Sequence, residues 1–251
     1  MRVARIGFTP VKGGRHRTHG SVWLTRAGAR GDRAFCLVDP ATDRCIRTAA
    51  HPALLQADAA WHGRVLSVEL PSGTVAGEPV PTGRVRTVDY WGRTTTVAEV
   101  AGPWSAAYSA HVGRDVVLAS AAPGEVVYGG AVTLVTGASL ARLSDEVGAA
   151  VDGARFRATF QLDGPDLRAH AEDDWAGRRL RLGTAEVRVL GAVPRCGVID
   201  LHPASGVRDL GVLSALAGLR PTPGAAVFGV DAEVTVPGRV GTGDPATLAQ
   251  G

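Results

Sequence analysis

The sequence predicts a mainly β fold of the α+β class with a barrel-type architecture. Three observations lead to this prediction. Short alternating or apolar segments are separated by turns rich in the 33 glycines and 15 prolines of the chain, helical spacing occurs in only three places, and no repeat of fixed period is present. Many short strands with few helices are typical of such folds. The 251 residues suffice for one large β domain or two smaller lobes.

The first half of the chain is predicted to consist almost entirely of strands. Segments 34–38 and 44–48 flank the turn 39–43 and form a predicted hairpin, which brings Cys36 close to Cys45 as small core residues. The other predicted strands are 2–9, 21–25, 61–70, 84–89, 93–100 and 116–119, with a turn at 90–92.

Helical spacing marks three segments. The first is 103–111, the second is 139–147 with Thr136 or Ser139 as its cap, and the third is 209–219. The predicted strands of the second half are 131–136, 156–162, 179–182, 185–190, 226–230 and 233–236.

Proline and glycine at Pro123-Gly124 mark a boundary within 121–130. It divides the chain into an N-terminal lobe, 1–122, and a core domain, 123–251.

Composition and charge exclude several classes of function. The net charge of +3 is small and the basic residues are scattered without interleaved aromatics, so no nucleic-acid partner is expected. No apolar run approaches the roughly 18 residues of a membrane span, and the N-terminus resembles a strand rather than a signal peptide. A cytoplasmic protein without a membrane partner is therefore expected. Three cysteines without a CxxC pair argue against a disulfide framework and against zinc or iron–sulfur sites.

Cys196 is the main candidate for chemistry. It follows the strand 185–190, between Arg195 and Gly197. The end of a strand exposes a thiol, a neighbouring guanidinium stabilises the thiolate, and glycine lets a ligand approach the backbone. A structural role for one cysteine after one arginine is the alternative.

Four basic residues elsewhere in the sequence are candidates for binding an anion. Lys12 is the only lysine among 27 basic residues and lies in a glycine-rich turn, while Arg33 precedes a hairpin strand. Arg155 and Arg157 are expected at the start of a strand, where an arginine that points inward needs an anion. The alternative is an internal salt bridge to one of the carboxylates Asp32, Glu172 or Asp173.

Two further residues are candidates for proton transfer. Asp200 and His202 follow Cys196 closely, so each is a candidate acid or base beside the thiol. A solvent-facing loop is the alternative for His202.

A set of short motifs occurs in order along nearly the whole chain. The motifs are Pro10-Val11-Lys12-Gly13, Gly31-Asp32-Arg33 through Asp39, Thr48-x-x-x-Pro52-x-Leu54, Val132–Val135, Ala138-Ser139-Leu140-x-x-Leu143, Val151-Asp152, Arg155-Phe156-Arg157, Glu172–Trp175, Arg195-Cys196, Pro203–Gly206, Phe228–Val230, Pro237-Gly238 and Gly243-Asp244-Pro245. Their order resembles the molybdenum-cofactor sulfurase C-terminal (MOSC) family, with its N-terminal β-barrel segment, and is similar to its amidoxime-reducing component members.

The resemblance implies a MOSC-type β-barrel core and a molybdopterin cofactor in a cleft between lobes. Cys196 would be the protein thiolate on molybdenum, since thiolates are soft ligands. Lys12 and Arg33, with Arg155 or Arg157 and with Arg195 beside the thiol, would hold the phosphorylated cofactor. Such a protein would reduce N-hydroxylated small molecules with electrons from a separate donor protein.

The chain departs from the family pattern at two places. Ala158-Thr159 stand where Pro-Asn is frequent, and Ile199-Asp200 with His202-Pro203 stand where related reductases commonly carry Thr and Asp-Pro. A carboxylate at Asp200 would alter the charge and the proton supply of the metal site.

Two other functions stay open from the sequence. One is a metal-free sulfur-transfer or carbon–sulfur-processing enzyme with Cys196 as nucleophile or persulfide carrier and Lys12 or Asp200 for proton transfer. The other is a non-catalytic binder of a cofactor or small anion.

Overall fold

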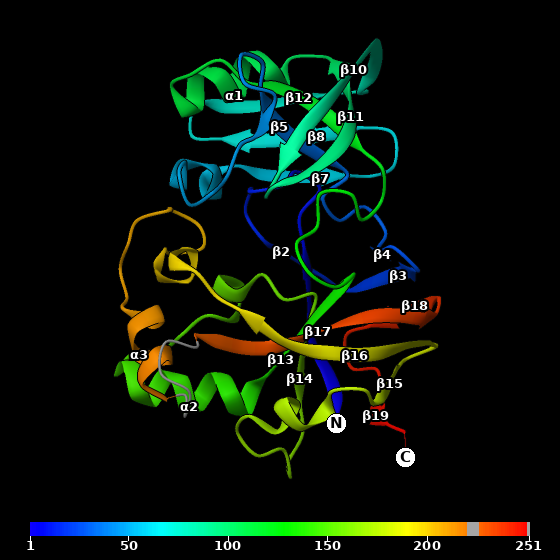
Figure 1. The fold of residues 1–251 in the computed structure, drawn as a ribbon, viewed down its shortest axis with the longest axis vertical. Helices are drawn as coiled ribbons and strands as arrows, with labels where there is room; N and C mark the ends of the chain where they lie inside the picture. The colour runs from blue at the N-terminus through cyan, green and yellow to red at the C-terminus, as the bar shows by residue number, and fades with distance from the viewer. Residues whose placement is uncertain (220–225, 250–251) are drawn as a thin grey trace.

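The computed structural model describes residues 1–219 and 226–249. This part of the chain forms two lobes stacked along the long axis of the molecule (Figure 1). Most of the regular structure is strand, and the described residues contain three α-helices. The prediction of a mainly β, α+β fold is therefore confirmed.

The lower lobe of Figure 1 is built on one large sheet. Its eight strands follow the order β19 (Ala246–Leu248), β15 (Arg179–Leu182), β16 (Ala185–Pro194), β17 (Val227–Val236), β13 (Val132–Thr136), β14 (Phe160–Asp163), β1 (Arg2–Phe8) and β2 (Arg17–His19). Only β13 and β14 pair in parallel among these strands. A three-stranded sheet of β18 (Gly238–Gly241), β3 (Ser21–Thr25) and β4 (Gly28–Ala29) lies beside it.

Alternation of side chains explains how the large sheet forms its core. In β16, Ala185, Val187 and Val189 are buried, while Arg188 and Leu190 between and beyond them are exposed. Successive side chains of a strand point to opposite faces, so this pattern covers one face with apolar groups. The buried face joins residues of β1, β3, β13, β14 and β17 in one apolar cluster.

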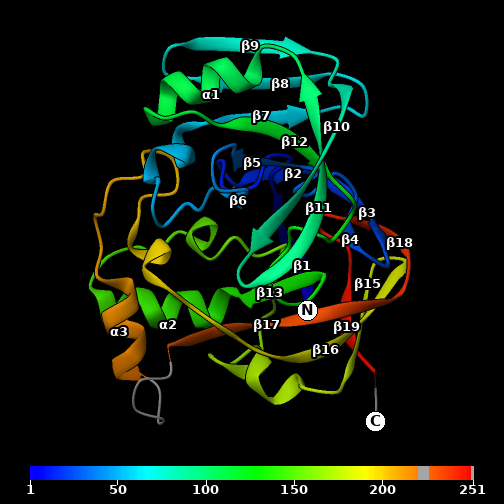
Figure 2. The same ribbon diagram turned by 45° about the horizontal axis from the view of Figure 1, so that its top comes forward.

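The upper lobe contains a closed five-stranded barrel. Its strands follow the order β10 (Val80–Tyr90), β11 (Arg93–Ala101), β12 (Val117–Ala121), β5 (Phe35–Asp39) and β6 (Arg44–Cys45). A second sheet consists of β7 (Asp58–Trp61), β8 (Leu66–Leu70) and β9 (Gly73–Gly77). Helix α1 (Trp104–Val112) buries Trp104 and Tyr108 completely in the core of this lobe. In Figure 2 the hairpin of β10 and β11 extends from this lobe toward the lower one.

The two lobes are not consecutive segments of the chain. Strands β1 to β4 belong to the lower lobe, residues 30–121 form the upper lobe, and the chain returns to the lower lobe at β13. Val11 bridges Phe35 where the chain passes between the lobes. Lys12 and Arg33 therefore lie on neighbouring segments at the junction, although they are 21 positions apart in the sequence.

The remaining helices lie mainly on one side of the lower sheet. α2 (Gly137–Val147) and α3 (Val212–Leu219) share an apolar cluster. Thr136 caps α2, because its side-chain oxygen accepts a hydrogen bond from the Ser139 backbone N–H at 3.2 Å. Four short 3₁₀ segments complete the fold: η1 (Pro52–Gln56), η2 (Gly153–Phe156), η3 (Ala171–Trp175) and η4 (Gly197–Asp200).

Several predicted elements differ from the observed ones. Residues 156–162 are not one strand: η2 occupies the first part, and β14 begins only at Phe160. Arg155 and Arg157 therefore do not open a strand, and Arg157 has the left-handed φ of 52°. Segment 61–70 divides into β7 and β8, whereas the two predicted strands 226–230 and 233–236 form the single strand β17. In the described part of the chain, no helix is both long and apolar enough to span a membrane.

Candidate functional site

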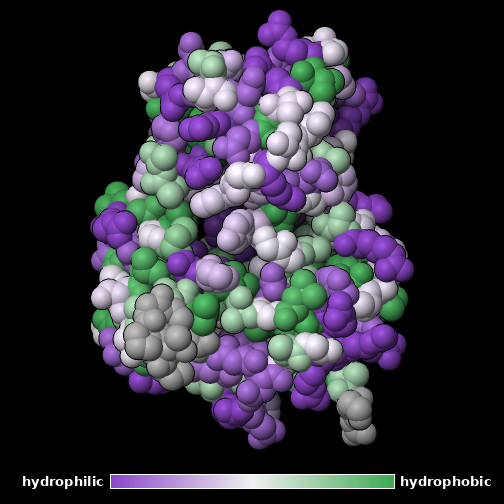
Figure 3. Space-filling view, viewed as in Figure 1, coloured by the Kyte–Doolittle hydropathy of each residue, from purple (hydrophilic) through white to green (hydrophobic). Residues whose placement is uncertain are grey.

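A cavity of about 280 Å³ lies at the junction of the two lobes. In Figure 3 the surface is hollowed between them. The wall includes residues from the crossing segments, from the tip of the β10–β11 hairpin, and from η2, β16 and η4. Six of its side chains are cationic: Lys12, Arg33, Arg47, Arg155, Arg157 and Arg195. No Asp or Glu occurs among the described residues that line it. The cavity therefore has the charge of an anion-binding site.

Cys196 lies in the wall of this cavity and is exposed. It follows the end of β16 and precedes η4, so its position at the end of a strand is as the sequence predicts. Cys36 and Cys45 are buried instead, with their sulfur atoms 4.0 Å apart in the β5–β6 hairpin. Their predicted proximity as core residues is confirmed, and Cys196 is the cysteine available to a ligand.

Arg195 lies in the cavity wall but gives its hydrogen bonds to the backbone. Its Nε and Nη2 donate to the Phe228 carbonyl oxygen at 2.9 and 2.6 Å, and its Nη1 donates to the Phe156 oxygen at 2.9 Å. Burial lowers the pKa of Arg195 to about 10, while Cys196 and Asp231 act in the opposite direction. The guanidinium therefore fixes the strand end before Cys196 and adds positive charge beside the thiol.

Arg157 is a buried cation that is only partly used by the protein. Its Nη1 donates to the Gly14 carbonyl oxygen at 2.8 Å, whereas Nη2 is buried without a hydrogen-bond partner. Burial, and then repulsion by Arg33, lowers its pKa to about 10. An unpaired buried donor is costly unless a ligand accepts its hydrogen bond. Arg157 is therefore available to an anion in the cavity.

Lys12 and Arg33 both line the cavity at the junction of the lobes. The Lys12 Nζ lies 4.7 Å from the centroid of the Tyr90 ring. Arg33 pairs with Asp32, whose other carboxylate oxygen accepts a weak bond from the Thr9 N–H at 3.3 Å. Burial, followed by the positive charges of Arg33 and Arg157, lowers the pKa of Lys12 to about 7.

Arg155 has a structural role that differs from its predicted one. Its Nη1 and Nη2 form a bidentate salt bridge with the Asp209 carboxylate, at 2.8 and 2.7 Å. Nη1 also donates to the Ile199 and Leu201 carbonyl oxygens. The internal salt bridge proposed as the alternative therefore exists, but its partner is Asp209 rather than Asp32, Glu172 or Asp173. Arg155 holds the loop after Cys196 in place.

Asp200 and His202 do not face the cavity. The Asp200 carboxylate pairs with Arg208 and accepts a bond from the Leu213 N–H at 2.7 Å, at the start of α3. His202 is exposed, and its Nδ1 accepts from the backbone N–H groups of Ala204 and Ser205. Neither residue lines the cavity. The structure therefore does not bring these two predicted side chains into the cavity wall beside Cys196.

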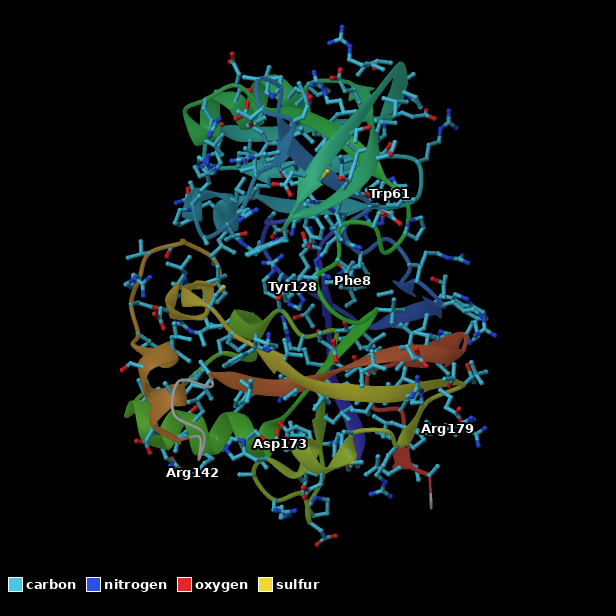
Figure 4. The ribbon with its side chains drawn as sticks, in the orientation of Figure 1. Phe8, Trp61, Tyr128, Arg142, Asp173 and Arg179 are labelled. Carbon is cyan, nitrogen blue, oxygen red and sulfur yellow. The ribbon has the colours of Figure 1, made fainter. Side chains whose placement is uncertain are left out.

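The upper side of the cavity has an aromatic wall that the sequence analysis did not predict. Tyr90 is buried with an unpaired hydroxyl, and Trp91 and Tyr128 are exposed with ring centroids 5.5 Å apart. Figure 4 shows Tyr128 between the lobes. The Arg47 guanidinium stacks 4.3 Å from the Trp91 ring. Two adjacent aromatics in the turn 90–92 were the available signal, because hairpin turns normally carry polar residues.

Two protein-family models together match nearly the whole chain. The model of the MOSC N-terminal beta barrel domain matches residues 1–107, and the MOSC domain model matches residues 109–247. A molybdenum cofactor sulfurase of Oryza sativa subsp. japonica is 34% identical over 82 residues, which is 32% of this chain and 10% of that protein. The chain thus matches about a tenth of the length of that relative.

Among solved structures, the YUAD protein of Bacillus subtilis aligns over 98% of this chain and 94% of its own, with 12% identity and a TM-score of 0.49. YiiM of Geobacillus stearothermophilus aligns over 48% of this chain and 55% of its own, with 19% identity and a TM-score of 0.36. The two domain models lie side by side along the sequence in the order that the motifs indicate. The chain belongs to the MOSC domain family.

Proposed function

We propose that the cavity binds a molybdopterin-type cofactor and that the protein is a molybdenum-dependent oxidoreductase for N-hydroxylated or related small molecules. The observation that carries the proposal is one exposed thiol in a cavity whose charged side chains are all cationic. A phosphorylated group on a thiolate-bound metal needs both features.

The residues present fit such a group. Arg157 Nη2 and Tyr90 Oη are buried polar atoms without partners, and both residues line the cavity. Lys12, Arg33 and Arg157 would hold the phosphate, and Cys196 would be the protein ligand of the metal. Among the described residues, no group of three or more His, Cys, Asp or Glu side chains could hold a metal ion. Cys196 would therefore act as a single protein ligand.

In this proposal, the bound cofactor supplies the two-electron redox chemistry. An N-hydroxyl compound gains two electrons and two protons, its N–O bond breaks, and the products are the N–H compound and water. Arg195 holds the strand end before Cys196, and Arg155 holds the loop after it, so the thiol stays in one position. The electrons come from a separate donor protein, and the substrate enters past Trp91 and Tyr128 at the exposed side of the wall.

The experiment is metal and cofactor analysis of protein from a host that makes molybdopterin. We expect about one molybdenum atom per chain, loss of molybdenum in Cys196→Ala, and retention in the control Cys36→Ala, whose thiol is buried in the barrel. A metal-free wild type would contradict the proposal, and full metal in Cys196→Ala would remove Cys196 from its role. If the wild type and Cys196→Ala instead bind the cofactor equally well, the protein is a non-catalytic binder.

A sulfur-transfer function is the second candidate, favoured by the partial match to a molybdenum cofactor sulfurase. The Cys196 thiolate would then attack the outer sulfur of a donor persulfide and release the donor thiolate, or attack an electrophilic carbon of a substrate and displace its leaving group, in the same cationic cavity. Intact-mass spectrometry during turnover distinguishes the two: a molybdenum-free active protein with one added sulfur atom on Cys196 supports this candidate. An unmodified Cys196 in a molybdenum-containing active protein excludes it.

A further inference from the structure

Lys12 differs from the other cations of the cavity in its chemistry. The arginines of the cavity keep their protons at neutral pH, whereas lysine can titrate there when it is buried. Lys12 is the only lysine of the chain, and the described residues provide no hydrogen bond or ion pair to its Nζ. Its polar contact is the face of the Tyr90 ring.

The backbone of Lys12 is fixed at the junction of the lobes. Its N–H donates to the Phe35 carbonyl oxygen at 2.8 Å, and Gly13 follows with a φ of 89°, a left-handed conformation that favours glycine. The side chain is thereby held in the cavity wall. An added Cβ at Gly13 would lie 3.0 Å from Leu54, so the turn also packs closely.

The groups around Lys12 come from four elements. The guanidinium of Arg33, in the segment before β5, and that of Arg157, after η2, are both positive and repel an ammonium. The thiols of Cys36 on β5 and Cys45 on β6 and the ring of Tyr90 on β10 complete the surroundings. Burial raises the pKa of Tyr90 to about 12, so its phenol stays neutral. The two thiols favour the charged form of Lys12, but they do not offset burial and the two guanidiniums, because the pKa of Lys12 is still lowered.

We propose that Lys12 takes up a proton when a phosphate-bearing ligand enters the cavity and releases that proton when the ligand leaves. The Nζ lone pair binds a proton from solvent, and the resulting ammonium pairs with the ligand dianion. The inference rests on the proposed binding of a phosphorylated group. The effect follows from charge: two guanidiniums disfavour the ammonium, and a dianion placed between them reverses the sign of the local field.

The pKa of Lys12, lowered to about 7 in the free protein, agrees with this inference. Above pH 7 most of the amine is neutral, and a bound dianion restores the pKa toward the usual value of lysine. Binding and protonation are then linked, so the affinity for the anion falls as the pH rises through this range.

The experiment uses the full chain, made in a host without molybdopterin and labelled with [¹³C,¹⁵N]lysine. One lysine gives one Cε resonance, whose shift reports protonation of Nζ directly. The probe is inorganic sulfate, a dianion that does not itself titrate near neutral pH. We expect a midpoint near 7 without sulfate and a midpoint at least one pH unit higher at saturating sulfate.

A matched variant separates the role of the proton from that of the charge. In Lys12→Arg the cation is permanent, so sulfate affinity should stay constant between pH 7.5 and 9. In the wild type it should fall by up to about tenfold per pH unit over the same range.

The outcomes distinguish this inference from the proposed function. A Lys12 midpoint near that of free lysine, or sulfate binding without any shift of the midpoint, overturns the inference and leaves the anion site standing. Failure of the wild type to bind sulfate at any pH, judged from the whole amide spectrum, overturns both.

Discussion

The residue with the largest electrostatic cost at the site is Lys12. Burial and two neighbouring guanidiniums lower its pKa from 10.5 to about 7. Below pH 7 the lysine is charged in both the folded and the unfolded chain, so the folded protein carries the full cost. As the pH rises from 7 to 10.5, the folded protein loses the proton first, and the cost disappears.

We therefore predict that Lys12→Met stabilises the free protein at low pH. Methionine keeps much of the apolar stem and removes the charge. The free energy of unfolding of Lys12→Met should exceed that of the wild type by a few kcal/mol at pH 6. The difference should shrink toward zero at pH 10, because Lys12 destabilises the folded wild type only while its amine is charged. Urea unfolding at both pH values measures it. The exposed Arg30→Met serves as a control, and an equal effect of Lys12→Met at both pH values would contradict the argument.

At the same scale, residue type predicted the site better than chain proximity did. Lys12 and Cys196 are rare residue types, and the cavity contains both. Asp200 and His202 follow Cys196 closely in the sequence, but the turn of η4 directs Asp200 to Arg208 and the start of α3. Sequence separation says little about direction in a 3₁₀ turn, where three residues complete a rotation.

At the scale of elements, the N-terminus of α2 joins a helix cap to a buried carboxylate. The Oε2 of Glu172 accepts hydrogen bonds from the Thr136 and Ser139 hydroxyls at 3.0 and 2.8 Å, and Glu172 is completely buried. The Thr136 oxygen also accepts the Ser139 N–H. One hydroxyl therefore serves both the helix and the η3 segment that carries Glu172.

We predict that Thr136→Val lowers the free energy of unfolding by about 2–4 kcal/mol, since it removes a cap worth about 1 kcal/mol and one donor to a buried carboxylate. Valine has nearly the same shape, so packing is preserved. Thr136→Ser keeps the hydroxyl and should lose less than half as much. Urea unfolding of the three proteins measures the difference, and equal losses in the two variants would refute the dual role of the hydroxyl.

Local patterns predicted regular elements well and irregular ones poorly. β3 and β15 have the predicted bounds, and α2 starts at a predicted cap, because alternation and capping act within a few residues. The sequence predicts a strand that begins within η2, whereas the Asp152 side chain accepts the Ala154 N–H and turns the chain there. Arg157 then has a left-handed backbone conformation, and its side chain donates to the carbonyl oxygen of Gly14, which is 143 positions away. Such a contact leaves no signal in the local sequence.

At the scale of the whole molecule, the interleaved chain connects the two lobes and builds the cavity. Lys12, Arg33 and Tyr90 come from the first 121 residues, and Arg157, Arg195 and Cys196 from the last 120. The motifs predicted these participants except Tyr90, but the pairing of β1 with β14 and of β3 with β18 depends on long-range contacts. The division at residue 122 remains a prediction about domains, which fragments can test.

We predict that residues 123–251 alone do not fold cooperatively. Without β1 they lose Val3 and Ile6, which are completely buried in the core of the lower lobe, and without β3 the strand β18 loses its partner. Each large buried side chain contributes about 1.5–3 kcal/mol, so the loss is comparable with the total stability of a domain. Gly124 lies close to Ala27, since a Cβ at position 124 would be 3.5 Å from the Ala27 carbonyl oxygen.

That proximity allows a matched control in which residues 1–30 are joined to 123–251 by a short glycine linker. The fusion lacks the upper lobe but keeps every strand of the large sheet, so it should show a cooperative urea transition where the 123–251 fragment shows none. Circular dichroism with urea titration measures both proteins. If the fragment alone unfolds with the same midpoint as the fusion, the N-terminal strands are dispensable, and the lower lobe is a domain formed by consecutive residues after all.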